Sequence, residues 1–157
     1  MAHIFKALAL TGAAVALVAA GTVKIDNSIR PAAQVARDVD RKPAAMLAFA
    51  QIKSGQTVVD LLPGGGYFTR LIAQTVGPNG KVIALVPDQY AKAVPKAQTD
   101  IEALAAEPAY RNVTAAIRPI TEIGAAASVD RVFTAQNYHD LKSKNVPAAT
   151  AGLCRPN

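Results

Sequence analysis

The chain has 157 residues, of which 51% are hydrophobic and only 5% aromatic, and its formal net charge is +6. This length suffices for one hydrophobic core, so we expect one folded domain. The 17 Lys and Arg residues are scattered and do not form a basic stripe with interleaved aromatic rings, which argues against nucleic acid as a partner. The single cysteine, Cys154, excludes an intramolecular disulfide and any metal site built from cysteines, and we expect no bound metal.

The N-terminus has the pattern of a secretory signal peptide. Lys6 supplies a positive charge, residues 7–20 are an uninterrupted run of small and apolar residues, and the segment 18–20 has the small side chains that a signal peptidase accepts. A membrane anchor is the alternative, but the run is shorter than the roughly 18 residues of a spanning helix. We therefore predict that residues 1–20 are removed, that the protein is exported to a periplasm, and that it keeps no stable membrane anchor.

The residues after the signal peptide are polar and irregular, and we interpret them as a linker with a short helix through 32–37. Asp40 followed by Pro43 is typical of the start of a helix, because an acidic cap and an early proline both suit its first turn. Apolar spacing continues this helix to residue 52, and Gly55 is the expected end.

From residue 57 onwards, short apolar strands alternate with helical segments. Strands are predicted over residues 57–62, 81–86, 113–117 and 129–134, and helices over residues 68–76 and 95–107. This alternation is typical of an α/β fold with an open parallel sheet covered by helices.

Three consecutive glycines, Gly64 to Gly66, lie between the first strand and its helix. Ligands bind at this end of parallel sheets, and the exposed N–H groups of a glycine turn favour a carboxylate or a phosphate. A tight turn that binds nothing is the alternative. A dinucleotide site is disfavoured, because Thr69 stands where the last glycine of that fingerprint belongs and Ala84 where its acidic residue belongs.

The segment 58–69, VVDLLPGGGYFT, resembles the first motif of class I S-adenosylmethionine-dependent methyltransferases, in which an acidic strand residue precedes a glycine-rich loop that wraps the cofactor. Further segments resemble a group of exported, predicted methyltransferases of bacteria: Arg37-Asp38, Arg41-Lys42-Pro43, residues 81–87 and residues 137–141. The resemblance implies a Rossmann-like fold with strand order 3-2-1-4-5-7-6, S-adenosylmethionine as cofactor, and transfer of a methyl group to an acceptor that the sequence does not identify.

The resemblance also implies roles for individual residues. Those expected to bind the cofactor lie in and around the glycine loop and after the second strand: Asp60, Leu62, Pro63, Gly64, Gly65, Gly66, Tyr67 and Asp88. Those expected to face the methyl group and the substrate follow the fourth strand: Asn137, Tyr138, His139 and Asp140. His139 is interpreted as a general base or hydrogen-bond partner, or else as a loop residue without a chemical role.

Three positions depart from the pattern of the resembled family. Leu62 replaces the first loop glycine, Val86 replaces the acid that binds the ribose, and Arg118 stands where an acid near the adenine is common. Asp88 is the nearest substitute for the ribose acid. These departures leave a second hypothesis open, in which the chain is a non-catalytic exported binding module for a small anionic molecule.

The sequence predicts four of the seven strands that the resemblance implies. The expected organisation is a signal peptide over 1–20, a linker with a short helix over 21–40, a partial methyltransferase domain over 41–141 and an irregular tail over 142–157. We interpret the chain as a C-terminally truncated form in which the fourth strand is an exposed apolar edge. The sequence does not identify the oligomeric state.

Overall fold

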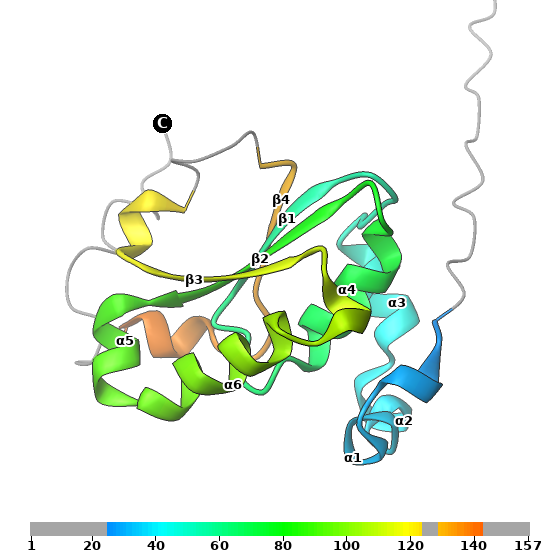
Figure 1. Cartoon of the computed structure of the whole chain (residues 1–157), viewed down its shortest axis with the longest axis horizontal. Helices are drawn as coiled ribbons and strands as arrows, with labels where there is room; N and C mark the ends of the chain where they lie inside the picture. The colour runs from blue at the N-terminus through cyan, green and yellow to red at the C-terminus, as the bar shows by residue number, and fades with distance from the viewer. Residues whose placement is uncertain (1–24, 124–128, 143–157) are drawn as a thin grey trace, which may run out of the picture.

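A computed structural model describes residues 25–123 and 129–142 of the chain. Its centre is a parallel sheet of four strands in the order β3-β2-β1-β4 (Figure 1). The strands are β1 (Thr57–Leu61), β2 (Lys81–Pro87), β3 (Val113–Arg118) and β4 (Arg131–Phe133). The predicted α/β class is thereby confirmed, and the strand order agrees with the first four strands of the expected sheet. The signal peptide prediction falls on residues outside the described ranges.

The helices surround this sheet. They are η1 (Asn27–Ile29), α1 (Ala32–Val35), α2 (Asp38–Arg41), α3 (Pro43–Phe49), α4 (Tyr67–Val76), α5 (Asp88–Ala93), α6 (Pro95–Ala105), η2 (Pro108–Tyr110), η3 (Ile120–Glu122) and η4 (Tyr138–Lys142). Figure 1 shows α4 and α6 on one face of the sheet and η3 on the other. No helix within the described ranges is long and apolar enough to cross a membrane.

The main core lies between the sheet and helices α4 and α6. Leu71 and Ile72 of α4 and Ile101 of α6 are fully buried against alternate residues of the strands, such as Val58 and Val82. In each helix the apolar residues recur at helical spacing in the sequence. They therefore lie on one face of the helix, and this face packs on the sheet. Each buried Leu or Ile side chain contributes about 1.5–3 kcal/mol to folding.

The second face of the sheet has a smaller apolar cluster. Val59, Leu61 and Leu85 are buried there together with Ile120 of η3. Val132 of β4, whose register partner is Val59, is 51% exposed. In the described part of the chain β4 pairs only with β1, so β4 is an edge strand that carries an exposed apolar side chain.

The N-terminal helices differ from the expectation. The single helix predicted from Asp40 to residue 52 is wrong, because Lys42 adopts a left-handed conformation (φ 45°) that separates α2 from α3. The cause is Pro43, which disfavours helical dihedrals in the residue before it and starts α3 as its first residue. Helix α3 ends at Phe49, six residues before the predicted stop at Gly55, and Gln51 follows in a left-handed conformation (φ 54°).

The segment between residues 30 and 41 is attached to α4 by a buried polar network. Both terminal nitrogens of Arg30 donate to the Asp38 carboxylate at 2.8 Å, and the Tyr67 hydroxyl donates to the same carboxylate at 2.6 Å. These hydrogen bonds hold the pKa of Asp38 below its usual value, chiefly those from the Arg30 guanidinium, and burial opposes the shift. This network fixes α1 and α2 beside the start of α4, next to the glycine turn.

Candidate functional site

The turn between β1 and α4 is built from residues 62–66 at the carboxyl end of β1. Leu62, Gly64 and Gly66 all have positive φ, at 56°, 56° and 75°. The turn is held on both sides: the Leu62 N–H donates to the Leu85 carbonyl oxygen of β2 at 2.9 Å, and the Leu62 carbonyl oxygen accepts from Asn137 Nδ2 at 2.5 Å. The backbone is therefore fixed before any ligand arrives.

Leu62 occupies a left-handed position that normally favours glycine. A side chain in this conformation costs roughly 1–2 kcal/mol. The Leu62 side chain is only 4% exposed and packs in the apolar cluster on the second sheet face. Burial of a leucine contributes about 1.5–3 kcal/mol, so packing offsets the backbone strain. The departure from the family pattern is thus accommodated by the core.

Gly64, Gly65 and Gly66 differ in the space that surrounds them. A side chain at Gly64 or Gly65 would meet no atom within 4 Å, so both face open space beside the turn. A β-carbon on Gly66 would lie 2.2 Å from Leu104 Cδ1 and 3.0 Å from Arg70 Nη1. Gly66 therefore makes room for α6, whereas Gly64 and Gly65 leave backbone accessible to a ligand.

Two cavities flank the turn. The first has a volume of about 210 Å³ and lies toward α5 and α6, and the second has a volume of about 170 Å³ and lies toward α1, α2 and the end of β4. The first cavity is lined by Leu62, Pro63, Gly64, Gly65, Val86, Tyr90, Val94, Lys96, Ala97, Asp100, Asn137 and Asp140. The second is lined by Gln34, Arg37, Arg41, Asp60, Leu62, Pro63, Gly64, Gly65, Tyr67, Phe68, Ala135, Gln136 and Asn137.

The two cavities share one wall. Asn137 and residues 62–65 line both. The two cavities are therefore adjacent along the glycine turn.

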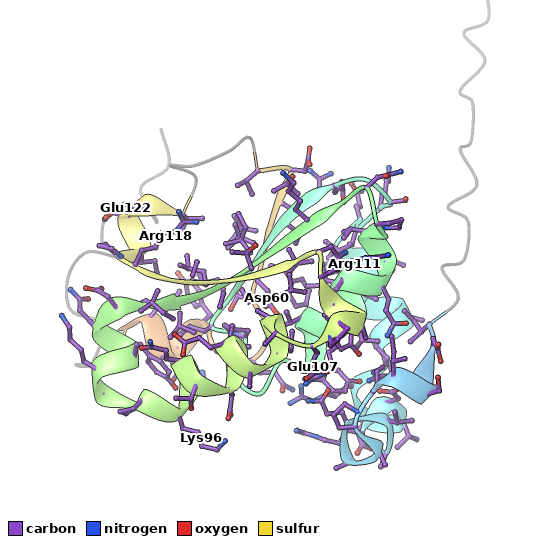
Figure 2. All side chains as sticks on the ribbon, in the orientation of Figure 1. Asp60, Lys96, Glu107, Arg111, Arg118 and Glu122 are labelled. Carbon is purple, nitrogen blue, oxygen red and sulfur yellow. The ribbon has the colours of Figure 1, made fainter. Side chains whose placement is uncertain are left out.

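Asp60 is the acidic residue of β1 at the inner end of the second cavity. It is 3% exposed, and its Oδ2 accepts a hydrogen bond from Thr69 Oγ1 at 2.6 Å. Burial raises the pKa of Asp60 to about 6, and the Thr69 hydrogen bond opposes this rise. Figure 2 labels Asp60 at the centre of the molecule, between the strands and the helices.

The N-terminal segment supplies one side of the second cavity. Gln34 Nε2 donates to the Gly65 carbonyl oxygen at 2.9 Å, which connects α1 to the glycine turn. Arg41 Nη2 donates to Gln136 Oε1 at 3.1 Å, and the Arg41 guanidinium lies 4.6 Å from the centroid of the Tyr67 ring. Sequence reasoning did not assign Gln34 or Arg41 to the site, although the Arg41-Lys42-Pro43 segment was a signal that pointed to this part of the chain.

Several residues expected at the site lie outside both cavities. Gly66, Asp88, Tyr138 and His139 line neither of them. The His139 side chain is 79% exposed, and its Nε2 lies 3.3 Å from Asp140 Oδ1. Asp88 is the first residue of α5, and its Oδ2 lies 3.8 Å from Lys92 Nζ. Of the four residues expected to face the substrate after β4, Asn137 and Asp140 do contribute to the cavity walls.

Comparison with protein families gives a match over most of the described chain. The family model of protein-L-isoaspartate(D-aspartate) O-methyltransferase (PCMT) matches residues 28–131, which is more than half of the 157 residues. The chain belongs to this methyltransferase family. The expected membership of the class I S-adenosylmethionine-dependent methyltransferases is thereby confirmed. A search of the curated proteins gave no match.

Solved structures with this fold include other methyltransferases. A SAM-dependent methyltransferase from Aquifex aeolicus is 25% identical, with a TM-score of 0.53, and the match covers 76% of this chain and 62% of that one. A protein-L-isoaspartate O-methyltransferase is 20% identical, with a TM-score of 0.46, over 60% of this chain and 28% of that one. A SAM-dependent O-methyltransferase from Thermotoga maritima is 22% identical, with a TM-score of 0.46, over 60% and 34%. The chain thus spans between 28% and 62% of the length of these structures.

The residues of this methyltransferase-family chain fit S-adenosylmethionine in two respects. Gly64 and Gly65 leave an open cradle, so a ligand has room along the turn. Asp100 and Asp140 line the first cavity, and a carboxylate can accept hydrogen bonds from hydroxyl groups such as those of a ribose. At the end of β2 the buried Val86 lines the first cavity in place of an acid, and Asp88 does not line that cavity.

Proposed function

We propose that this chain binds S-adenosylmethionine across the turn formed by residues 62–66 and transfers its methyl group to an acceptor. The observation that supports this function is the pair of cavities that share the open Gly64-Gly65 wall, in a chain of the PCMT family. Such a wall suits an elongated ligand with an adenosine at one end and an amino acid at the other.

The proposed chemistry needs alignment more than acid–base catalysis. When bound, S-adenosylmethionine would supply a methyl group on a positively charged sulfur. An acceptor atom would form a bond to the methyl carbon in line with the carbon–sulfur bond, which would break so that S-adenosylhomocysteine leaves. Holding two reactants in line is worth about 7–11 kcal/mol in favourable cases. In this chain Asn137 fixes the turn through Leu62, and Asp140 lines the first cavity together with Asn137. We propose that residues 137–140 face the acceptor, with His139 as the residue that removes a proton where the acceptor carries one.

The family description supplies a candidate acceptor. It names L-isoaspartate and D-aspartate residues of proteins and transfer to oxygen. We propose a carboxylate oxygen of such a residue as the first acceptor to test. The assay compares incorporation of a labelled methyl group into an isoaspartyl peptide and into the same peptide with a normal aspartyl bond. Equal incorporation into both, or none into either, would contradict this acceptor.

Binding is tested by calorimetry with S-adenosylhomocysteine, the demethylated product. Gly65 lies at the centre of the shared wall and faces open space, so Gly65→Val fills the cradle without a steric clash inside the protein. We expect at least about a tenfold loss of affinity, because the backbone approach of the ligand is blocked. Thr114→Val, on the exposed part of β3, is the matched control and should bind like the unaltered protein. Unaltered affinity in Gly65→Val would place the ligand elsewhere.

A second candidate function is a binding module without turnover. The buried Val86 at the end of β2 favours it, because the ribose acid of the resembled family is absent there. Binding of S-adenosylhomocysteine without methyl transfer to any acceptor would favour this alternative. Turnover of S-adenosylmethionine would exclude it.

We further propose that the protein is exported to a periplasm, as in the exported bacterial group that its sequence resembles. The support comes from the positively charged start and the apolar run over residues 7–20. Intact-mass analysis of the protein recovered from the periplasm tests this proposal. A product that begins near residue 21 is expected, whereas a product that retains Lys6 would contradict cleavage.

A further inference from the structure

Two residues that line the second cavity each carry a buried polar atom without a hydrogen-bond partner. The two atoms are Gln34 Oε1 and Arg41 Nε. Buried polar groups in folded proteins are nearly always paired, and an unpaired one costs about 1–3 kcal/mol. Two such atoms in one cavity wall therefore point to a ligand that pairs with both.

The orientation of each side chain is fixed by its other contacts. Gln34 Nε2 donates one N–H to the Gly65 carbonyl oxygen, and this bond holds the amide with Oε1 as its unpaired acceptor. The Arg41 guanidinium is held by Gln136 and by the face of the Tyr67 ring. A ligand in the second cavity thus meets one fixed acceptor and one fixed cationic donor.

The charge of Arg41 is not balanced within the described ranges. Its side chain forms no ion pair there, and neither does that of Arg37, which lines the same cavity. Burial lowers the pKa of Arg41, and the positive charge of Arg37 lowers it further. An anionic group in the cavity would favour the charged form of Arg41 and so offset both effects.

We propose that Gln34 and Arg41 recognise the α-amino-acid head group at the methionyl end of S-adenosylmethionine. Gln34 Oε1 accepts a hydrogen bond from the ammonium group, and Arg41 Nε donates to the carboxylate. This inference rests on the proposed function, and it makes the N-terminal segment part of the cofactor site.

The pairing of an acceptor with a cation selects this chemistry. A simple carboxylate would satisfy Arg41 but would leave Gln34 Oε1 unpaired, because an ionised carboxylate carries no donor. An amino-acid head group carries both charges on one carbon atom and satisfies both side chains. The wall shared by the two cavities places this head group next to the rest of the same ligand.

The recognising side chains are held in place before binding. Arg30 and Tyr67 both hydrogen-bond to Asp38, and these contacts attach the segment that carries Gln34 and Arg41 to α4. Side chains that are already ordered lose little entropy on binding, so the contacts contribute more fully to affinity.

The experiment compares two ligands in the unaltered full chain and in Arg41→Met. S-adenosylhomocysteine has the amino-acid head group, whereas 5′-methylthioadenosine retains the adenosine and the sulfur without it. Calorimetry should show that Arg41→Met lowers the affinity for S-adenosylhomocysteine at least about tenfold, because a charge-assisted hydrogen bond is lost. The affinity of the same variant for 5′-methylthioadenosine should stay within about twofold of that of the unaltered protein. Arg111→Met, beside the start of β3 and outside both cavities (Figure 2), should leave both affinities unaltered.

The outcomes separate this inference from the function on which it rests. If Arg41→Met lowers the affinity for both ligands equally, or for neither, then Arg41 does not bind the head group and the inference is wrong. The proposal that the chain binds the cofactor is unaffected by that result. If the unaltered protein binds neither ligand, the proposed function fails and the inference fails with it. Arg41→Lys keeps the charge but not the Nε donor, so it should recover only part of the affinity for S-adenosylhomocysteine.

Discussion

Asn137 and Leu62 are 75 residues apart in the sequence, and the Asn137 side chain donates a hydrogen bond to the Leu62 carbonyl oxygen. This bond connects the loop after β4 to the glycine turn after β1. Both cavities are lined by these two residues. The geometry of the site therefore depends on a contact between two strand ends that are far apart in the sequence.

Asn137→Ala should destabilise the fold and weaken ligand binding together. Loss of the half-buried hydrogen bond leaves the Leu62 carbonyl oxygen without its side-chain partner, which costs about 1–2 kcal/mol of unfolding free energy. Chemical denaturation and calorimetry with S-adenosylhomocysteine measure the two effects. Gln98→Ala removes an amide hydrogen bond to Glu102 on the outside of α6 and should leave both quantities nearly unaltered. Equal behaviour of the two variants would show that the Asn137 contact does not stabilise the site.

Substitutions of Leu62 should reverse the usual order of alanine and glycine. Both Leu62→Ala and Leu62→Gly lose the buried side chain, which costs about 2–5 kcal/mol. Only glycine also relieves the positive φ, so Leu62→Gly should be more stable than Leu62→Ala by about 1 kcal/mol. Urea denaturation of the two variants tests this order. A more stable alanine variant would mean that the left-handed conformation is not retained.

The stability of the protein should fall between pH 4 and pH 7 through Asp60. The pKa of Asp60 is about 6 in the fold against 3.8 for an unperturbed group, so the folded state binds this proton more tightly than the unfolded state. Stability from this group is complete below the unfolded pKa and is lost as the pH rises through the folded pKa. The loss is about 3 kcal/mol, since one pKa unit corresponds to about 1.36 kcal/mol.

Asp60→Asn isolates this effect from other carboxylates. An asparagine keeps an oxygen that accepts from Thr69 but carries no charge, so the variant should gain stability relative to the unaltered protein as the pH rises from 4.5 to 7.5. Urea denaturation at several pH values measures the difference. A difference that stays constant over this range would show that Asp60 does not titrate there.

Gly66→Ala should destabilise the protein through its clash with Leu104. The left-handed φ of 75° and the crowded β-carbon position each cost about 1–2 kcal/mol. Leu104→Ala removes the crowding atom, so the double variant should be more stable than the sum of the two single effects predicts, by about 1 kcal/mol. A double-mutant cycle measures this coupling. Strict additivity would indicate that Gly66 is required only for its backbone conformation.

The strands and the main helices could be predicted because their signals are local. The β-branched run that contains Val58 and Val59 and the helical spacing of Leu71 and Ile72 each report the face that packs on the core. The predicted bounds agree with β1, β2 and β3 to within one residue. Helix α5 was missed, since its six residues show too little apolar periodicity to be recognised.

The site was predicted less completely, for a physical reason. The glycine turn can be recognised in the sequence from its consecutive glycines. Which of these glycines has open space for a ligand cannot, because Gly66 is crowded by Leu104, which lies 38 positions later in the chain. The assignment of Gln34 and Arg41 to the second cavity likewise depends on how α1 and α2 pack on α4. Such contacts between distant segments leave no periodic trace in the sequence.

Strand β4 sets a limit on how rigid the glycine turn can be. Within the described ranges three residue pairs join β4 to β1 and Val132 is half exposed, so we expect β4 to separate from the sheet at a lower free energy than the core unfolds. Each such opening also removes Asn137 from Leu62. Hydrogen exchange of the Leu62 amide measures opening of the turn, and exchange of the paired β4 amides measures opening of the strand. We expect the turn to open at the rate at which β4 separates from the sheet.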